Sequence, residues 1–187
     1  MMDGKKYREA MLNELSRTLL ELDEEQVETA VSEIMTAKRL FFAGAGRAGL
    51  MMKGFAMRMM HMGYICHVVG DVTTPSIQPG DLLLVASGKA ETQTSGYYVD
   101  TAKKYGAKSL VITANPSGSV AQKADLLLVL MAPRFRGDLE PLHRSVQPMG
   151  NRFEQSVLLT GDYLVKLIKE KRNLDIHVMY QNHATLE

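Results

Sequence analysis

Cysteine is almost absent from this chain, because Cys66 is its single thiol among 187 residues. One thiol cannot form a disulfide within the chain, nor can it supply a cysteine cluster for structural zinc. A reducing, cytoplasmic compartment is therefore expected. The sequence also has no run of about 18 uncharged apolar residues, and its N-terminus opens on a charge-dotted stretch, so neither a membrane span nor a signal peptide is predicted.

An excess of charge of either sign is also missing. The 22 Lys and Arg residues face 21 Asp and Glu residues, which gives a formal net charge of +1. Without a strong overall field, neither nucleic acid nor a membrane surface is expected as a partner. The length leaves room for one compact domain, but not for a nucleotide-binding domain followed by a separate substrate domain.

Short apolar runs alternate with helix-like periodicity along most of the chain. Strands are predicted at 38–43, 64–69, 81–86, 108–113 and 125–131, and helices at 5–20, 23–35, 48–62, 91–105, 117–123 and 150–172. Such alternation predicts an α/β fold, with one doubly wound sheet of five parallel strands covered by helices on both faces. We divide the single domain into N-terminal helices (1–36), an α/β core (38–172) and a tail (173–187).

Two glycine-containing turns give the first chemical signal, and both lead from a predicted strand into a predicted helix. The candidate phosphate ligands are Gly44, Gly46 and Arg47 in the first turn, and Ser87, Gly88, Lys89 and Thr92 in the second. Such turns bring backbone N–H groups and the positive end of a helix dipole close to an anion. In the alternative interpretation, the glycines serve only the geometry of tight turns. Since ligands of parallel sheets lie beyond the carboxyl ends of the strands, we expect both turns to converge on one phosphate.

Several longer segments of the sequence resemble those of a known family. They are residues 41–47, 55–63, 74–77, 80–83, 145–150, 153–155 and 183–187, and they cover nearly the whole chain. Together they resemble the sugar isomerase (SIS) domain family of phosphosugar isomerases and binders, and within it the 6-phospho-3-hexuloisomerases. Gln147-Pro148-Met149-Gly150 and the C-terminal segment are the more diagnostic parts, because the glycine turns are common to all SIS domains.

This resemblance implies a flavodoxin-like three-layer sandwich that assembles as a homotetramer. It also implies interconversion of 3-hexulose 6-phosphate and fructose 6-phosphate, without a metal or an organic cofactor. The chain departs from the family pattern in both turns, at Ala48, Lys89 and Ala90, where a serine, a serine and a glycine are usual. The Lys89 ammonium could replace a lost hydroxyl as a phosphate partner.

Glu154 is the leading candidate for the base that such an isomerisation requires. Moving a carbonyl from C3 to C2 removes a proton from the neighbouring carbon and passes through an enediolate. Glu154 is predicted in the first turn of the last long helix, where a solvated carboxylate that favours the helix dipole is the alternative. His61 is the next candidate, as a proton shuttle, with a hydrogen-bonded histidine at a helix C-terminus as its alternative.

The tail and the methionine-rich helix both point to a homo-oligomer. Residues 174–187 have little to bury and would ordinarily fray, but the resemblance suggests that they reach a neighbouring subunit and bring His183 to its site. The helix at 48–62 is so apolar that we expect burial on nearly all sides, which needs a partner surface. The connection at 132–147 is expected to be a solvated loop, with a lid over the substrate as the alternative.

Two functional hypotheses stay open at this point. The first is the isomerase of hexulose 6-phosphate, or of a different phosphosugar. The second is a non-catalytic sugar-phosphate-binding SIS protein of the kind attached to regulators. The first 37 residues lack a basic recognition face for DNA, which favours the enzyme.

Overall fold

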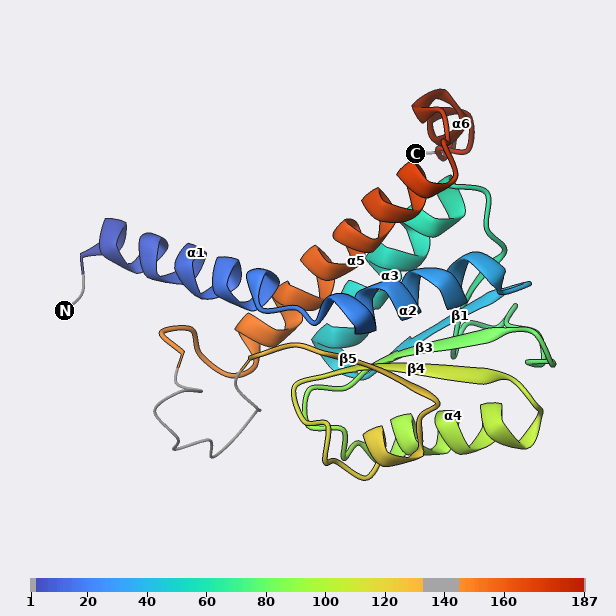
Figure 1. Cartoon of the computed structure of the whole chain (residues 1–187), viewed down its shortest axis with the longest axis horizontal. Coiled ribbons are helices and arrows are strands. Elements are labelled where there is room, and N and C mark those ends of the chain that lie inside the picture. Colours follow the sequence, from blue (N-terminus) through green and yellow to red (C-terminus); the bar gives the residue numbers. More distant parts are fainter. Residues whose placement is uncertain (1–2, 133–144, 187) are drawn as a thin grey trace.

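The computed structural model describes residues 3–132 and 145–186 (Figure 1). Its elements are α1 (Gly4–Leu20), α2 (Glu24–Thr36), β1 (Leu40–Gly44), α3 (Gly46–His61), β2 (Cys66–Val68), β3 (Leu82–Ala86), α4 (Gln93–Lys104), β4 (Lys108–Thr113), η1 (Ala121–Lys123), β5 (Leu126–Val129), α5 (Asn151–Lys171) and α6 (Ile176–Gln181). The connection at 132–147, expected as a solvated loop with a lid as the alternative, falls largely outside the described residues.

The five strands form one sheet in the order β2-β1-β3-β4-β5, and every neighbouring pair is parallel. The chain runs from β1 outward to the edge strand β2 and then returns across β1 to β3. The strand order therefore switches between β1 and β3, which is the point where open α/β sheets bind their ligands. The predicted five-stranded parallel sheet is confirmed.

Helices cover both faces of this sheet and create two hydrophobic cores. Figure 1 shows α2, α3 and α5 on one face and α4 on the other. Side chains alternate along β1, so that Leu40 and Phe42 join the core under α3 and α5, while Phe41 and Ala43 join the core over α4. This is the predicted three-layer sandwich.

Local capping explains where several helices begin. The Asp23 carboxylate accepts a hydrogen bond from the Gln26 backbone N–H at 2.9 Å, which makes Asp23 the N-cap of α2. Asp175 caps α6 in the same way, through the backbone N–H of His177 at 2.9 Å. The sequence analysis did not predict α6, because a helix of six residues is too short to show an apolar period.

The prediction of a helix at 117–123 is wrong, because only the single 3₁₀ turn η1 forms there. The reason lies at Gly118, where a Cβ atom would stand 2.6 Å from the Lys89 carbonyl oxygen. The segment before η1 is held against the loop after β3 instead of coiling into a helix.

Two helices are more exposed than their apolar patterns predict. Thr18 is the only buried residue of α1, and Figure 1 shows this helix extending beyond the rest of the fold. Within one chain the methionine-rich helix α3 leaves Leu50 60% and Met57 45% exposed, so its burial on nearly all sides stays a prediction that requires the expected partner surface. No helix within residues 3–132 and 145–186 is both long and apolar enough to cross a membrane.

Candidate active site

A cavity of about 430 Å³ lies at the carboxyl ends of β1 and β3, between the two predicted turns and the start of α5. Its lining residues are Ala45, Gly46, Arg47, Ala48, Ala86, Ser87, Gly88, Lys89, Thr92, Met149, Gly150, Phe153 and Glu154. The structure thus brings Glu154 together with every predicted phosphate ligand except Gly44. The position agrees with the switch point of the strand order.

The first turn uses its glycines in two ways. A Cβ atom on Gly49 would stand 2.5 Å from the Gly44 carbonyl oxygen, so this pair lets the start of α3 pack directly on the end of β1. Gly44 does not line the cavity, and its role is the backbone-geometry alternative of the sequence analysis. Gly46 has φ of +56° and faces open space, and it begins α3 beside the cavity.

The second turn places two hydroxyls and an ammonium group around the same cavity. Ser87 Oγ and Thr92 Oγ1 lie 3.4 Å apart, and Lys89 lines the same cavity. A Cβ atom on Gly88 would stand 3.1 Å from the ring of Phe153, so the absence of a side chain allows α5 to approach this turn. Ala90 has φ of +52° although it is not glycine, and it is fully buried.

The helix α5 delivers the candidate base. Glu154 lies in its first turn, as predicted, and its side chain is 21% exposed. Arg47 Nη1 lies 2.8 Å from Glu154 Oε2 and 2.5 Å from Asn151 Oδ1, so the guanidinium bridges the first turn and α5 across the cavity mouth.

A buried arginine fixes the start of α5. Arg152 Nε donates to Thr18 Oγ1 at 2.9 Å, and its Nη2 donates to the Met131 carbonyl at 2.9 Å. Burial lowers the pKa of Arg152, although the carboxylates of Glu14 on α1 and of Glu21, the C-cap of that helix, act in the opposite direction. Through these bonds α1 and the end of β5 determine where Glu154 enters the cavity.

The two predicted catalytic histidines lie elsewhere in the chain. His61 and His183 stack with ring centroids 5.2 Å apart, and Arg58 Nη1 lies 3.3 Å from His61 Nδ1. They stand at the far end of α3, roughly 21 Å along the helix axis from Arg47 at a rise of 1.5 Å per residue. Figure 1 shows α6 at this same end, away from the start of α5. Within one chain, neither histidine reaches the cavity beside Glu154.

Sequence reasoning missed residues that act through contacts rather than through a motif. Asn151 could have been found, because a residue three positions before Glu154 on a helix shares its face. Arg152 and its partners gave no signal, since Thr18 and Met131 lie far away in the sequence. Asn115 donates to the carbonyl of Lys89 at 2.9 Å, and no motif of the sequence indicated this contact.

Metal and dinucleotide sites have little support among the described residues. Within residues 3–132 and 145–186, no three His, Cys, Asp or Glu side chains are arranged to hold a metal ion. Asp71 follows the first turn at a spacing in the sequence that would suit a ribose-binding carboxylate. In the structure, its carboxylate lies 3.8 Å from the Lys53 ammonium, and Asp71 does not line the cavity.

Comparison with known proteins agrees with the fold and the glycine turns. The SIS domain model matches residues 33–136, which include both turns. The 3-hexulose-6-phosphate isomerase of Bacillus subtilis (strain 168) is 36% identical over 181 residues, covering 97% of each chain. That of Mycobacterium gastri is 37% identical over 175 residues, covering 94% of this chain and 87% of the relative.

A solved structure gives the same result for the backbone. The crystal structure of a Methanococcus jannaschii protein, reported as implying a 3-hexulose-6-phosphate isomerase function, superposes with a TM-score of 0.82. The two sequences are 28% identical, and the match covers 97% of this chain and 99% of the other. The chain therefore belongs to the SIS domain family.

Proposed function

We propose that the protein is a phosphosugar isomerase that interconverts 3-hexulose 6-phosphate and fructose 6-phosphate. The carrying observation is that Glu154 stands over a cavity walled by two anion-type turns from adjacent strands. Relatives at 36–37% identity that carry the isomerase name support the choice of substrate. The proposed compartment is the cytoplasm, on the ground of the single thiol.

The phosphate is held between the two turns in this proposal. Gly46 and Arg47 contribute from the start of α3, where backbone N–H groups and the helix dipole favour an anion. Ser87, Lys89 and Thr92 contribute from the turn after β3. The Lys89 ammonium supplies the charge at a place where related proteins usually use a hydroxyl, and this favours a dianionic phosphate over a neutral group.

Glu154 then acts on the sugar. Its carboxylate removes the proton from C2 of the 3-ketose, the electrons move to the C3 oxygen, and a 2,3-enediolate forms. Transfer of the C2 hydroxyl proton to the C3 oxygen, and return of the abstracted proton to C3, give fructose 6-phosphate, so the reaction needs no external oxidant or reductant. Arg47, at 2.8 Å from Glu154 Oε2, aligns the carboxylate and places a positive charge near the enediolate oxygens.

The complete site is proposed to include a neighbouring subunit. His61 and His183 are separated from Glu154 within one chain, but the buried His61 stacks on the exposed His183 at the end of α3. Apolar side chains exposed beside them and on α1, including Met57, Met60 and Leu12, support a homo-oligomer, with a tetramer as the proposed state. A neighbour's histidines would supply the proton at the sugar oxygens or open the ring.

The central experiment supplies 3-hexulose 6-phosphate and measures fructose 6-phosphate for the wild type and for Glu154→Gln. The amide keeps the shape and the bond to Arg47 but cannot accept the proton, so kcat should fall by about 10²–10⁴. Glu170→Gln, at the exposed end of the same helix, is the matched control and should keep full activity. Equal rates in wild type and Glu154→Gln would remove Glu154 from the mechanism.

A mixing experiment tests the shared site. Glu154→Gln and His183→Gln are each expected to be poorly active alone, whereas oligomers assembled from both should regain part of the activity, because some sites then combine two intact residues. No recovery in mixed oligomers would place His183 outside the site.

The wild type also distinguishes the alternative functions. If it binds sugar phosphates but turns none over, the non-catalytic binding protein is the better description. If it turns over only another phosphosugar, the proposed substrate is replaced by that sugar.

A further inference from the structure

The loop after β3 is held from behind by the segment that follows β4. We call this segment, residues 113–120, the brace. The brace donates four hydrogen bonds to three successive backbone carbonyls of the loop. The Gly88 carbonyl accepts from the Ala114 N–H at 3.1 Å and from Thr113 Oγ1 at 3.2 Å. The Lys89 carbonyl accepts from Asn115 Nδ2 at 2.9 Å, and the Ala90 carbonyl accepts from the Val120 N–H at 2.8 Å. None of the brace residues lines the cavity.

A side-chain clamp closes the same contact. The Glu91 carboxylate accepts the Ser119 backbone N–H at 2.9 Å and the Ser119 hydroxyl at 2.6 Å, and these bonds lower the pKa of Glu91. At Gly118 the two backbones approach so closely that a Cβ atom would stand 2.7 Å from the Cβ of Ala90. The loop and the brace are therefore joined at four consecutive loop residues.

These bonds control where the loop directs its donors. In a planar trans peptide the N–H of one residue points opposite to the preceding carbonyl. Because the Gly88 carbonyl faces the brace, the N–H of Lys89 is turned away from the brace. If the hydrogen bonds from the brace to these carbonyls were lost, the peptide planes of the loop could rotate. The loop N–H groups would then lose their orientation toward an anion.

We propose that the brace positions the phosphate-binding loop, with Asn115 and Glu91 as positioning residues for the phosphate group of the substrate. This inference rests on the proposed function of the cavity. Neither residue touches the sugar carbons, so loss of either weakens binding of the phosphate and leaves the proton transfer at Glu154 in place. The expected signature is a change in KM without a matching change in kcat.

The test compares Asn115→Ala with Gln122→Ala. The Gln122 amide, in η1 just after the brace, donates to the Pro116 carbonyl of the brace at 2.9 Å, which is the same kind of bond made to the brace itself rather than to the loop. For each variant, inorganic phosphate binding is measured by calorimetry, and KM and kcat are measured with 3-hexulose 6-phosphate. We expect Asn115→Ala to raise both the phosphate Kd and KM about tenfold, the effect of one lost hydrogen bond, with kcat unchanged. Gln122→Ala should change none of them.

Ser119 provides a second, milder pair of variants in case Asn115→Ala does not fold. Ser119→Ala removes the hydroxyl half of the clamp and should raise the phosphate Kd by a few-fold, while Ser119→Thr keeps the hydroxyl and should restore it. An unchanged phosphate Kd in folded Asn115→Ala and Ser119→Ala, or a fall in kcat alone, overturns the proposal. A wild type that binds phosphate without isomerising sugars, and loses that binding in Asn115→Ala, would uphold the brace while rejecting the isomerase.

Discussion

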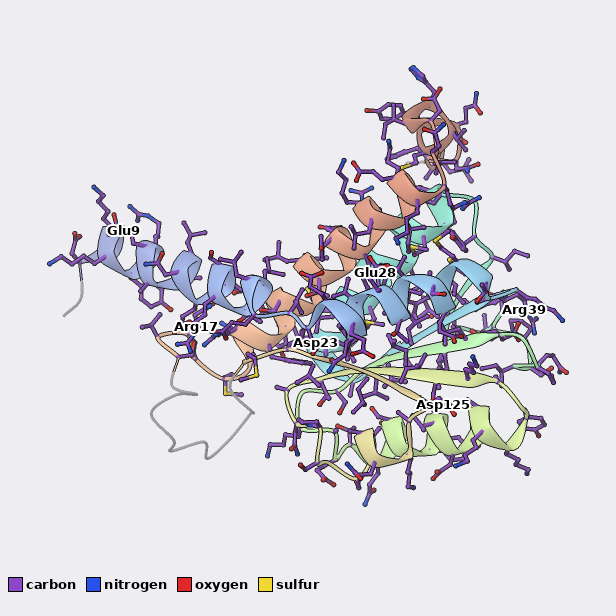
Figure 2. All side chains as sticks on the ribbon, in the orientation of Figure 1. Glu9, Arg17, Asp23, Glu28, Arg39 and Asp125 are labelled. Carbon is purple, nitrogen blue, oxygen red and sulfur yellow. The ribbon has the colours of Figure 1, made fainter. Side chains whose placement is uncertain are left out.

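The two edges of the sheet treat polar groups in opposite ways. At the amino ends of the strands they satisfy one another: Arg39, labelled in Figure 2, makes two bonds to the Asp81 carboxylate at 3.0 and 2.5 Å, and Asp125 accepts from Ser109 at 2.8 and 2.9 Å. At the carboxyl ends, hydroxyls and cations surround an open cavity, and Ala90 adopts positive φ beside it. One edge pairs its charged groups away from any cavity-lining turn, whereas the other arranges polar groups and a strained backbone around the cavity.

Breaking the Arg39–Asp81 pair should give the largest effect on stability. The Asp81 side chain is 1% exposed, so Asp81→Asn leaves the Arg39 guanidinium without its charged partner. We expect the free energy of unfolding to fall by about 3 kcal/mol in urea denaturation, near the low end for such pairs because Arg39 keeps 24% exposure. The kcat/KM of the folded variant should not change, since the pair lies at the edge opposite the cavity.

An exposed pair supplies the control for that comparison. Lys123 and Asp100 lie 2.7 Å apart, but both side chains are about half exposed, and Asp100→Asn should change stability by less than about 1 kcal/mol. Loss of activity in folded Asp81→Asn would show that the two edges are coupled.

Alkaline pH should weaken the amino-end edge through Cys66, the first residue of β2. Burial raises the pKa of its thiol from 9.0 to about 12. The neutral thiol of the folded state is favoured, so its contribution is complete below pH 9 and is lost as pH rises toward about 12. At pH 10 the wild type should lose roughly 1–2 kcal/mol of unfolding free energy from this group, relative to pH 7.

The Cys66→Val variant isolates that contribution. Both proteins are unfolded in urea at pH 7 and pH 10, and the wild type should show the larger loss. Tyr64, whose pKa burial also raises, remains in both proteins, and the Cys66 thiolate is the smallest cause of its shift, so most of the Tyr64 contribution cancels in the difference. Equal losses in the two proteins would mean that the Cys66 thiol ionises as readily in the folded chain as in the unfolded one.

The sequence predicted the carboxyl-end edge better than it predicted what surrounds it. Strand and helix periods placed the turns at Gly46 and Gly88, and topology alone brought them to one cavity, because parallel strands end at the same edge. Glu154 was found through the family resemblance, and the structure supplied its partner Arg47. Gly44 was assigned to phosphate, yet its neighbour Gly49 shows that it serves helix–strand packing.

Other features depended on contacts between distant segments. The helix predicted at 117–123, which overlaps the last part of the brace, followed from a suitable pattern, whereas the close approach of Gly118 to Lys89 decides the course of the chain there. The exposure of Leu50 and Met57 on α3 could not be predicted either. An apolar period indicates how much of a helix surface is apolar, but it does not indicate which element of the fold or which other chain covers that surface.

The smallest expected effect concerns strain at the carboxyl-end edge. Ala90 holds φ of +52°, which costs an L-residue about 1–2 kcal/mol compared with glycine, part of which is offset by the greater flexibility of glycine in the unfolded chain. Ala90→Gly should therefore raise the free energy of unfolding by about 1 kcal/mol. Ala10→Gly, in the helical backbone of α1, is the opposite case and should lower it by about 1 kcal/mol.

The KM of Ala90→Gly shows whether the backbone strain at Ala90 contributes to substrate binding. If Ala90→Gly gains stability and keeps the wild-type KM, the positive φ is a remnant that the brace tolerates through the Ala90–Val120 hydrogen bond. If KM rises, the Ala90 side chain, fully buried against Gly118, stiffens the loop, and its strain contributes to holding the anion site in place. A loss of stability in Ala90→Gly would contradict the contrast between the edges, because the carboxyl-end turn would then be as relaxed as the paired charges opposite it.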